Sequence, residues 1–134
     1  MFLQKPLLKE VLITGVLISL LHYAALTFHL YWTTMWFDVV MHFLGGFFIG
    51  LLALFTFYIS EWVEFPRDHA ASILAMTLGS VLLVGLGWEL WEVFVGFTDA
   101  LEDQVDTYVD LVMDTLGGIA AYLYGKRFVC LTQN

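Results

Sequence analysis

The fold of this chain is decided by a stretch that occurs twice. Residues 38–46 read Asp-Val-Val-Met-His-Phe-Leu-Gly-Gly, and residues 110–118 read Asp-Leu-Val-Met-Asp-Thr-Leu-Gly-Gly. On a helix, positions i, i+4 and i+7 fall on nearly one face, so each copy predicts a stripe of a carboxylate, a second ionisable group and a glycine. Because an internal repeat indicates a repeated architecture, we expect two related helices that build one site, with the glycines admitting a close neighbouring backbone.

The composition is that of an integral membrane protein. Of the 134 residues, 60% are hydrophobic and only 13% are charged, which is far from the composition of soluble domains. Four apolar segments approach or exceed the roughly 20 residues that span the hydrocarbon of a bilayer. We therefore predict an all-α fold, a single transmembrane domain over residues 1–134. Its four helices are expected at about residues 10–31, 37–60, 69–97 and 106–125.

The positions of the basic residues predict the orientation in the membrane. They fall at the N-terminus, in the second connection and at the C-terminus, as Lys5, Lys9, Arg67, Lys126 and Arg127. The positive-inside rule then places both termini in the cytoplasm. With the repeat in the second and fourth helices, the chain reads as two similar helical hairpins related by an axis along the membrane normal. The absence of a basic face excludes nucleic-acid binding.

Ionisable residues concentrate near the predicted outer boundary of the membrane. Each such group inside a membrane costs on the order of 2.5–3.5 kcal/mol by insertion scales, so their retention indicates function. His29 and Asp103 fall at compatible positions on the first and fourth segments. The expected metal ligands are Asp38, His42, Glu89, Asp106, Asp110 and Asp114, and the expected catalytic residues are Glu92 and Glu89.

A positive partner is required by these acids, because no lysine or arginine is predicted on their side of the membrane. Protons or a metal cation remain, and carboxylates with imidazole suit Mg²⁺, Mn²⁺, Fe²⁺ or Zn²⁺. Single elements also have structural explanations. Asp38 or Asp106 alone would serve as a helix N-cap, the glycine pairs alone would serve helix packing, and His22 is expected to be a hydrogen-bonded buried histidine.

The same motifs resemble those of a known family. Asp-x3-His-x2-Gly-Gly from Asp38, Glu-Leu-Trp-Glu at residues 89–92, and Asp-x3-Asp-x3-Asp-x2-Gly-Gly from Asp106 resemble the YjdF-like bacterial inner-membrane proteins, and more distantly the VanZ-like proteins. The resemblance covers roughly residues 38–121. VanZ-like chains carry a lysine where this chain has Val39, and tend to carry Asn where it has Asp114. The resemblance implies a multi-pass protein of the bacterial plasma membrane with a shared polar site, and it brings no established reaction.

Three functional hypotheses follow. The first is a metal-dependent membrane hydrolase or phosphotransferase that acts on a lipid phosphate head group at the outer leaflet, with one or two divalent ions and Glu92 as the general base. The alternative is a cation or proton-coupled transporter that uses the same acidic cluster. The third is an assembly partner whose polar cluster only joins helices. Membrane lipid is the expected partner in each case, and a homo-oligomer is compatible with all three.

Overall fold

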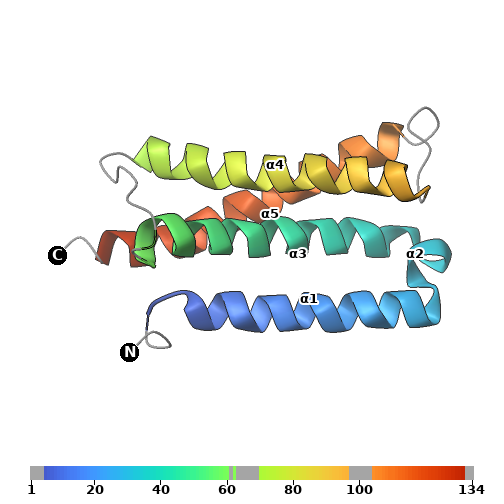
Figure 1. Ribbon diagram of the computed structural model, residues 1–134, viewed down its shortest axis with the longest axis horizontal. Helices are drawn as coiled ribbons and strands as arrows, with labels where there is room; N and C mark the ends of the chain where they lie inside the picture. The colour runs from blue at the N-terminus through green and yellow to red at the C-terminus, as the bar shows by residue number, and fades with distance from the viewer. Residues whose placement is uncertain (1–4, 61, 63–69, 97–103, 132–134) are drawn as a thin grey trace.

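The helices account for almost all of the described chain. The computed structural model describes residues 5–60, 62, 70–96 and 104–131, and among these it contains helices and no strand (Figure 1). Three helical spans are long and apolar enough to cross a membrane, namely Leu8–Phe28, Trp36–Ile59 and Ala70–Val95. The all-α class is therefore confirmed. The elements are α1 (Leu8–Phe28), α2 (Leu30–Thr33), α3 (Met35–Leu54), the π-helix η2 (Phe55–Ile59), α4 (Ala70–Val95) and α5 (Gln104–Leu131).

The first predicted segment is divided in the structure. α1 ends at Phe28 because His29 adopts a left-handed conformation with φ of 58°, and the His29 N–H donates to the carbonyl of Ala25. The short helix α2 follows and leads into α3. At this break the chain turns from the first long helix toward the second. The His29 side chain is exposed.

The other predicted segments differ only at their ends. α3 continues through the π-helical turn η2 to Ile59, one residue before the expected end. α4 runs from Ala70 to Val95, and the expected boundaries at residues 69 and 97 lie outside the described residues. α5 begins at Gln104 and reaches Leu131, so it extends beyond both limits of the expected segment 106–125.

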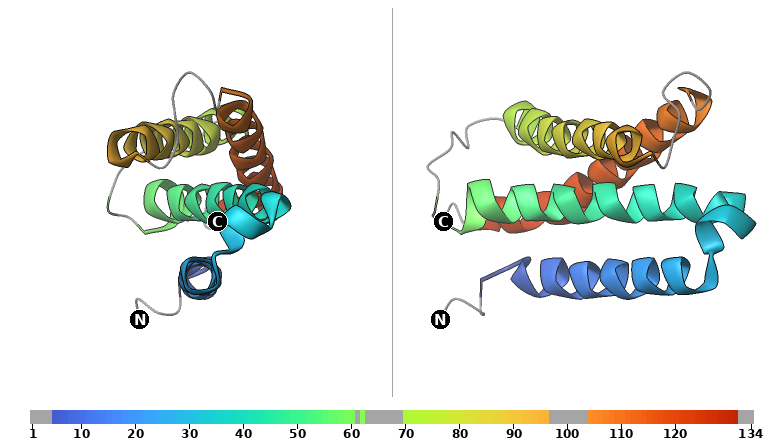
Figure 2. Two further views of the ribbon diagram at one scale, coloured as in Figure 1. Left: turned by 90° about the vertical axis from the view of Figure 1, so that its right-hand side faces the viewer. Right: turned by 45° about the vertical axis from the view of Figure 1, so that its right-hand side comes forward.

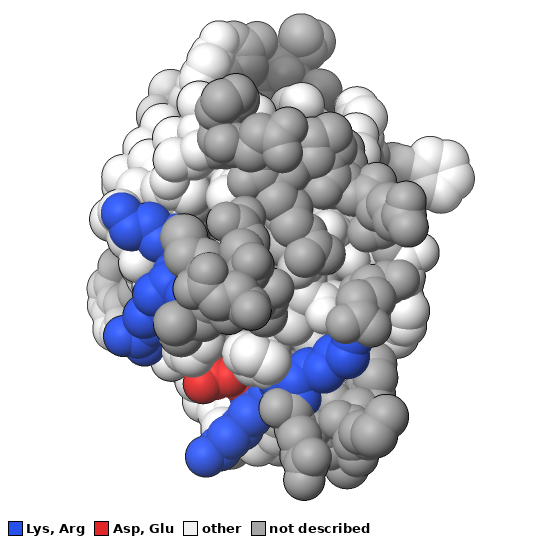
Figure 3. Space-filling view, turned by 90° about the vertical axis from the view of Figure 1, so that its left-hand side faces the viewer, with Lys and Arg blue, Asp and Glu red and all other residues white. Residues whose placement is uncertain are grey.

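Figure 1 shows that α3 and α5 begin at the same end of the bundle and run in the same direction, whereas α1 and α4 run in the opposite direction. In both views of Figure 2, α3 lies between α1 on one side and α4 on the other, and α5 crosses α3 at an angle. The start of α1 and the end of α5, the two chain ends of the described part, therefore lie at one end of the bundle. The described lysine and arginine side chains gather there (Figure 3).

The crossing of α3 and α5 depends on glycine. A Cβ atom added to Gly46 would overlap the backbone carbonyl of Asp114, and one added to Gly117 would overlap the backbone carbonyl of Phe43. Farther along both helices, a Cβ atom on Gly50 would lie 2.7 Å from the Cβ atom of Ala121. The two backbones are in direct contact at the crossing. The close approach predicted from the glycine pairs is confirmed.

An apolar core fills the half of the bundle that holds the chain ends. Lys5 lies at its edge, where its Nζ donates to the carbonyls of Ile59 and Ser60 at 3.2 and 2.9 Å and closes the end of η2. The core thus separates the basic end of the bundle from the ionisable residues at the other end. Its buried side chains include Leu7, Leu51, Leu54, Phe55, Ile73, Ala121 and Val129.

We expect Gly46→Ala to destabilise the protein, because its Cβ atom fits only if α3 and α5 separate. Overpacking of this kind costs roughly 1–3 kcal/mol. Gly87→Ala is the matched control, since a Cβ atom there meets nothing within 4 Å and alanine favours a helix by about 1 kcal/mol. Thermal unfolding in mild detergent should show a lower midpoint for Gly46→Ala and an unchanged or higher one for Gly87→Ala. Equal midpoints in the two variants would contradict the contact.

Candidate metal centre

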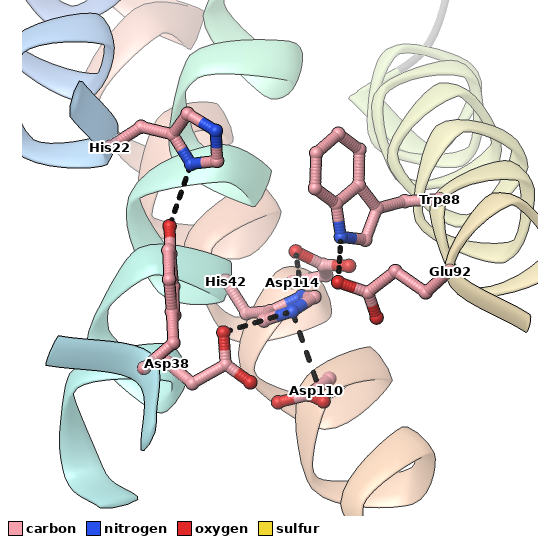
Figure 4. A network of polar contacts seen from close by, with 8 residues as sticks. His22, Asp38, His42, Trp88, Glu92, Asp110 and Asp114 are labelled. Carbon is pink, nitrogen blue, oxygen red and sulfur yellow. Dashed lines mark hydrogen bonds and ion pairs between the residues drawn. The ribbon is translucent and has the colours of Figure 1, made fainter. Parts of the chain in front are cut away.

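His42 lies at the centre of the ionisable cluster, with a carboxylate facing each side of its ring (Figure 4). Its Nε2 atom is 3.8 Å from Asp38 Oδ1 and 3.8 Å from Asp110 Oδ2. Its Nδ1 atom is 3.5 Å from Asp114 Oδ1. The exposed fractions are 8% for His42, 2% for Asp110 and 5% for Asp114. These three side chains are therefore inside the bundle, whereas the Asp38 side chain is 30% exposed.

Two helix faces and one crossing point build this arrangement. Asp38 and His42 are i and i+4 on α3, and Asp110 and Asp114 are i and i+4 on α5, so each pair lies on one face of its helix. The glycine contact between α3 and α5 lies about one turn farther along both helices. Because the backbones touch there, the carboxylates of α5 reach the imidazole of α3 directly, with no intervening layer of side chains.

The two nitrogens of His42 have different surroundings. Asp38, His42 and Asp110 each offer one ligand atom within 4.8 Å of the other two, a spacing that suits three ligands of one metal ion. Nε2 is the ring nitrogen that faces Asp38 and Asp110. The distances of 3.8 Å exceed the roughly 2.7–3.2 Å of an N–H···O hydrogen bond. Nδ1 faces Asp114 Oδ1 at 3.5 Å, which is closer than the Nε2 contacts but also longer than that range. A metal-bound histidine commonly donates its other ring N–H to a carboxylate, and Asp114 is placed to accept it.

α4 closes the cluster on the side that faces away from the His42 imidazole of α3. A Cβ atom on Gly85 would lie 2.5 Å from Asp114 Oδ2, so the Asp114 carboxylate reaches the backbone of α4. One turn after Gly85, Glu89 is 7% exposed and accepts a side-chain hydrogen bond from Thr107 of α5. Glu92 is half-buried, and its Oε1 accepts a hydrogen bond of 2.9 Å from Trp88 Nε1 (Figure 4).

The structure brings most of the expected site residues together. Asp38, His42, Asp110 and Asp114 form the cluster, and the two glutamates approach it from α4. Asp106 occupies the first turn of α5, where its side chain is exposed, although its charge still acts on Asp38, Glu89 and Asp110. It is not a member of the group that could hold a metal ion. Asp103 lies outside the described residues.

The histidines of the first helical segment do not join the cluster. The His29 ring packs against Trp32 at a centroid distance of 5.8 Å. His22 Nδ1 and the Tyr31 hydroxyl are 2.8 Å apart, which confirms the expectation of a hydrogen-bonded histidine. Burial and the charge of Asp38 raise the pKa of Tyr31 to about 12. The hydroxyl therefore stays protonated at neutral pH.

Sequence reasoning missed two contributors to the site. Gly85 makes room for the Asp114 carboxylate, and Thr107 holds Glu89. The signal for Gly85 was its position four residues before Glu89, on the same face of α4. No sequence signal identifies Thr107, because its contact depends on how α4 and α5 are aligned along their length.

Comparison with known families identifies the chain. The family model described as "Predicted membrane protein (DUF2238)" matches residues 5–130. No curated protein and no solved structure matches this chain. YjdF-like proteins form the matched family, so that resemblance is confirmed, whereas the likeness to VanZ-like proteins stays a prediction. With a match over nearly its whole length and three helices able to cross a membrane, the chain belongs to the DUF2238 family of membrane proteins.

Proposed function

We propose that the chain crosses the bacterial plasma membrane four times, with both termini in the cytoplasm and the His42 cluster near the outer leaflet. The gathering of lysine and arginine at the end that holds both chain ends (Figure 3) supports this orientation through the positive-inside rule. α5 has 28 residues and is ~42 Å long at ~1.5 Å per residue. That length exceeds the roughly 30 Å of hydrocarbon. α5 also crosses α3 inside the bundle.

At the outer end we propose a divalent-metal site with His42 Nε2, Asp38 Oδ1 and Asp110 Oδ2 as ligands. The observation that carries this proposal is the different use of the two ring nitrogens. Nε2 faces two carboxylate oxygens at 3.8 Å, while Nδ1 faces Asp114. Asp114 then orients the ring and is not itself a ligand of this ion. The mixed nitrogen and oxygen donor set suits Mn²⁺, Fe²⁺ or Zn²⁺ better than Mg²⁺.

The function that this site supports best is that of a metal-dependent hydrolase or phosphotransferase acting on a lipid phosphate head group. The site lies one to two helical turns from the outer ends of α3 and α5, which is a depth of roughly 5–12 Å. A bound divalent ion supplies the positive charge that attracts phosphate and activates water. The described lysine and arginine side chains lie at the opposite end (Figure 3). Glu92, held by Trp88, is the general base of this scheme.

A transporter is the second function compatible with an acidic site. Transport requires a path from the site to the other face of the membrane. In the described part of the bundle, the half that holds the chain ends is filled by apolar side chains such as Leu51, Leu54 and Val129. This apolar core supports the enzyme as the first choice. Ion flux in sealed liposomes without lipid turnover would reverse that choice.

The metal site predicts that protein purified in mild detergent without chelator contains about one equivalent of a transition metal, and that His42→Ala loses it. Elemental analysis measures the content directly. His29→Asn is the matched control, because His29 is exposed and lies outside the cluster, and asparagine tolerates its left-handed conformation. Absence of the metal after loading, or a metal content that is unchanged in His42→Ala, would contradict the site.

The enzyme proposal predicts that Glu92→Gln keeps the metal and loses catalysis. We expect release of inorganic phosphate from phosphatidic acid or a polyprenyl phosphate in the outer leaflet of sealed right-side-out vesicles. Loss of a general base lowers such a rate about 10²- to 10⁴-fold. Asp106→Asn, an exposed acid at the same end, should leave the rate unchanged. Turnover that survives in Glu92→Gln would rule out its role as the base.

A further inference from the structure

The alignment of α4 and α5 places Glu89 beside Asp110. The two helices run in opposite directions (Figure 1), and Gly85 of α4 contacts the Asp114 carboxylate of α5. One turn farther along α4 is Glu89, and one turn back along α5 is Asp110. The side-chain hydrogen bond between Thr107 and Glu89 supports the same alignment, because Thr107 is three residues before Asp110 on one face of α5. The two carboxylates therefore occupy one level of the α4–α5 interface.

Each of these carboxylates has a buried oxygen without a partner. Glu89 is 7% exposed and Asp110 is 2% exposed. Among the described residues, neither Glu89 Oε1 nor Asp110 Oδ1 has a hydrogen-bond partner. A buried unsatisfied polar group costs about 1–3 kcal/mol, and more if it is charged. Since native proteins satisfy the large majority of buried polar atoms, these two oxygens indicate a missing positive ligand.

The two oxygens of Asp110 have separate surroundings. Oδ2 is 3.8 Å from His42 Nε2 and belongs to the site proposed above, whereas Oδ1 is the oxygen without a partner. A carboxylate placed in this way can bridge two cations. The charge supports a second cation, because Glu89 adds a carboxylate to a cluster that already holds three aspartates and one imidazole.

We propose a second divalent-cation site, in which Asp110 Oδ1 and Glu89 Oε1 are the protein ligands and Asp110 bridges the two ions. Its donors are oxygens only, which suits Mg²⁺ or Mn²⁺. Such ions are commonly bound by one or two carboxylates, water and the phosphate of a substrate. The proposal rests on the first metal site and deepens the proposed function. A pair of ions suits the transfer of a phosphoryl group, because both the attacking and the leaving oxygen are stabilised.

The test is a titration of the chelator-stripped full-length protein with Mn²⁺, with free Mn²⁺ followed by electron paramagnetic resonance. Wild-type protein should bind two equivalents and Glu89→Gln one. His42→Ala should also bind one, because the oxygen site remains, and Asp110→Asn should bind neither ion tightly. Glu10→Gln, at the opposite end of the bundle, is the matched control and should bind two.

Each alternative outcome has a distinct meaning. One equivalent in wild type that is lost in His42→Ala would overturn the second site and leave the first intact, with a proton shared between Glu89 and Asp110. Two equivalents that persist in Glu89→Gln would also overturn it. No binding in wild type would remove the proposed function itself. If thermal unfolding shows that Glu89→Gln does not fold, the wild-type stoichiometry decides, and a value of one overturns the second site.

Discussion

The contact between the backbones of α3 and α5 is the constraint on which the rest of this structure depends. Gly46 and Gly117 remove the side chains that would separate the two helices. Residues one turn away then face one another across the crossing, which is how the imidazole of His42 comes to lie among carboxylates of both helices. In a membrane, where apolar side chains gain little by leaving lipid, such close backbone packing is a main source of helix association. Packing and chemistry therefore share the same nine-residue stretches.

Charge balance is the second constraint. Three aspartates and Glu89 surround a single histidine inside the bundle, and the described basic side chains lie at the other end (Figure 3). Proteins retain buried charges when these are paired or coordinate metals. A divalent ion bound at His42 Nε2 would supply the positive charge that these carboxylates require. The Nδ1 side of the ring already faces Asp114. Gly85 contributes to the same cluster, because it lets the Asp114 carboxylate fit against α4.

Much of this arrangement could be predicted from the sequence, because helical periodicity determines which residues share a face. Periodicity predicts that Asp38 shares a face with His42 and that Asp110 shares a face with Asp114. It also predicts the glycine one turn beyond each pair. Periodicity on one helix does not determine the alignment between helices. For that reason the position of Asp114 beside Nδ1 and the hydrogen bond of Thr107 to Glu89 became evident only from the structure.

Other differences arise at helix ends, where local conformation overrides an apolar pattern. The left-handed conformation of His29 divides a segment that reads as one continuous span. The sequence pattern groups Asp106 with the cluster. In the structure Asp106 lies in the first turn of α5, where its side chain is exposed. Asp106 is therefore outside the group that could hold a metal ion, whereas Asp110 on the same helix belongs to it.

The central claim is that His42 binds a metal ion through one ring nitrogen. The most direct measurement is pulsed electron paramagnetic resonance on protein saturated with Mn²⁺ and labelled with ¹⁵N-histidine. We expect coupling to a single histidine nitrogen, absent in His42→Ala although the other three of the four histidines remain. A spectrum without nitrogen coupling, or coupling that persists in His42→Ala, would contradict it.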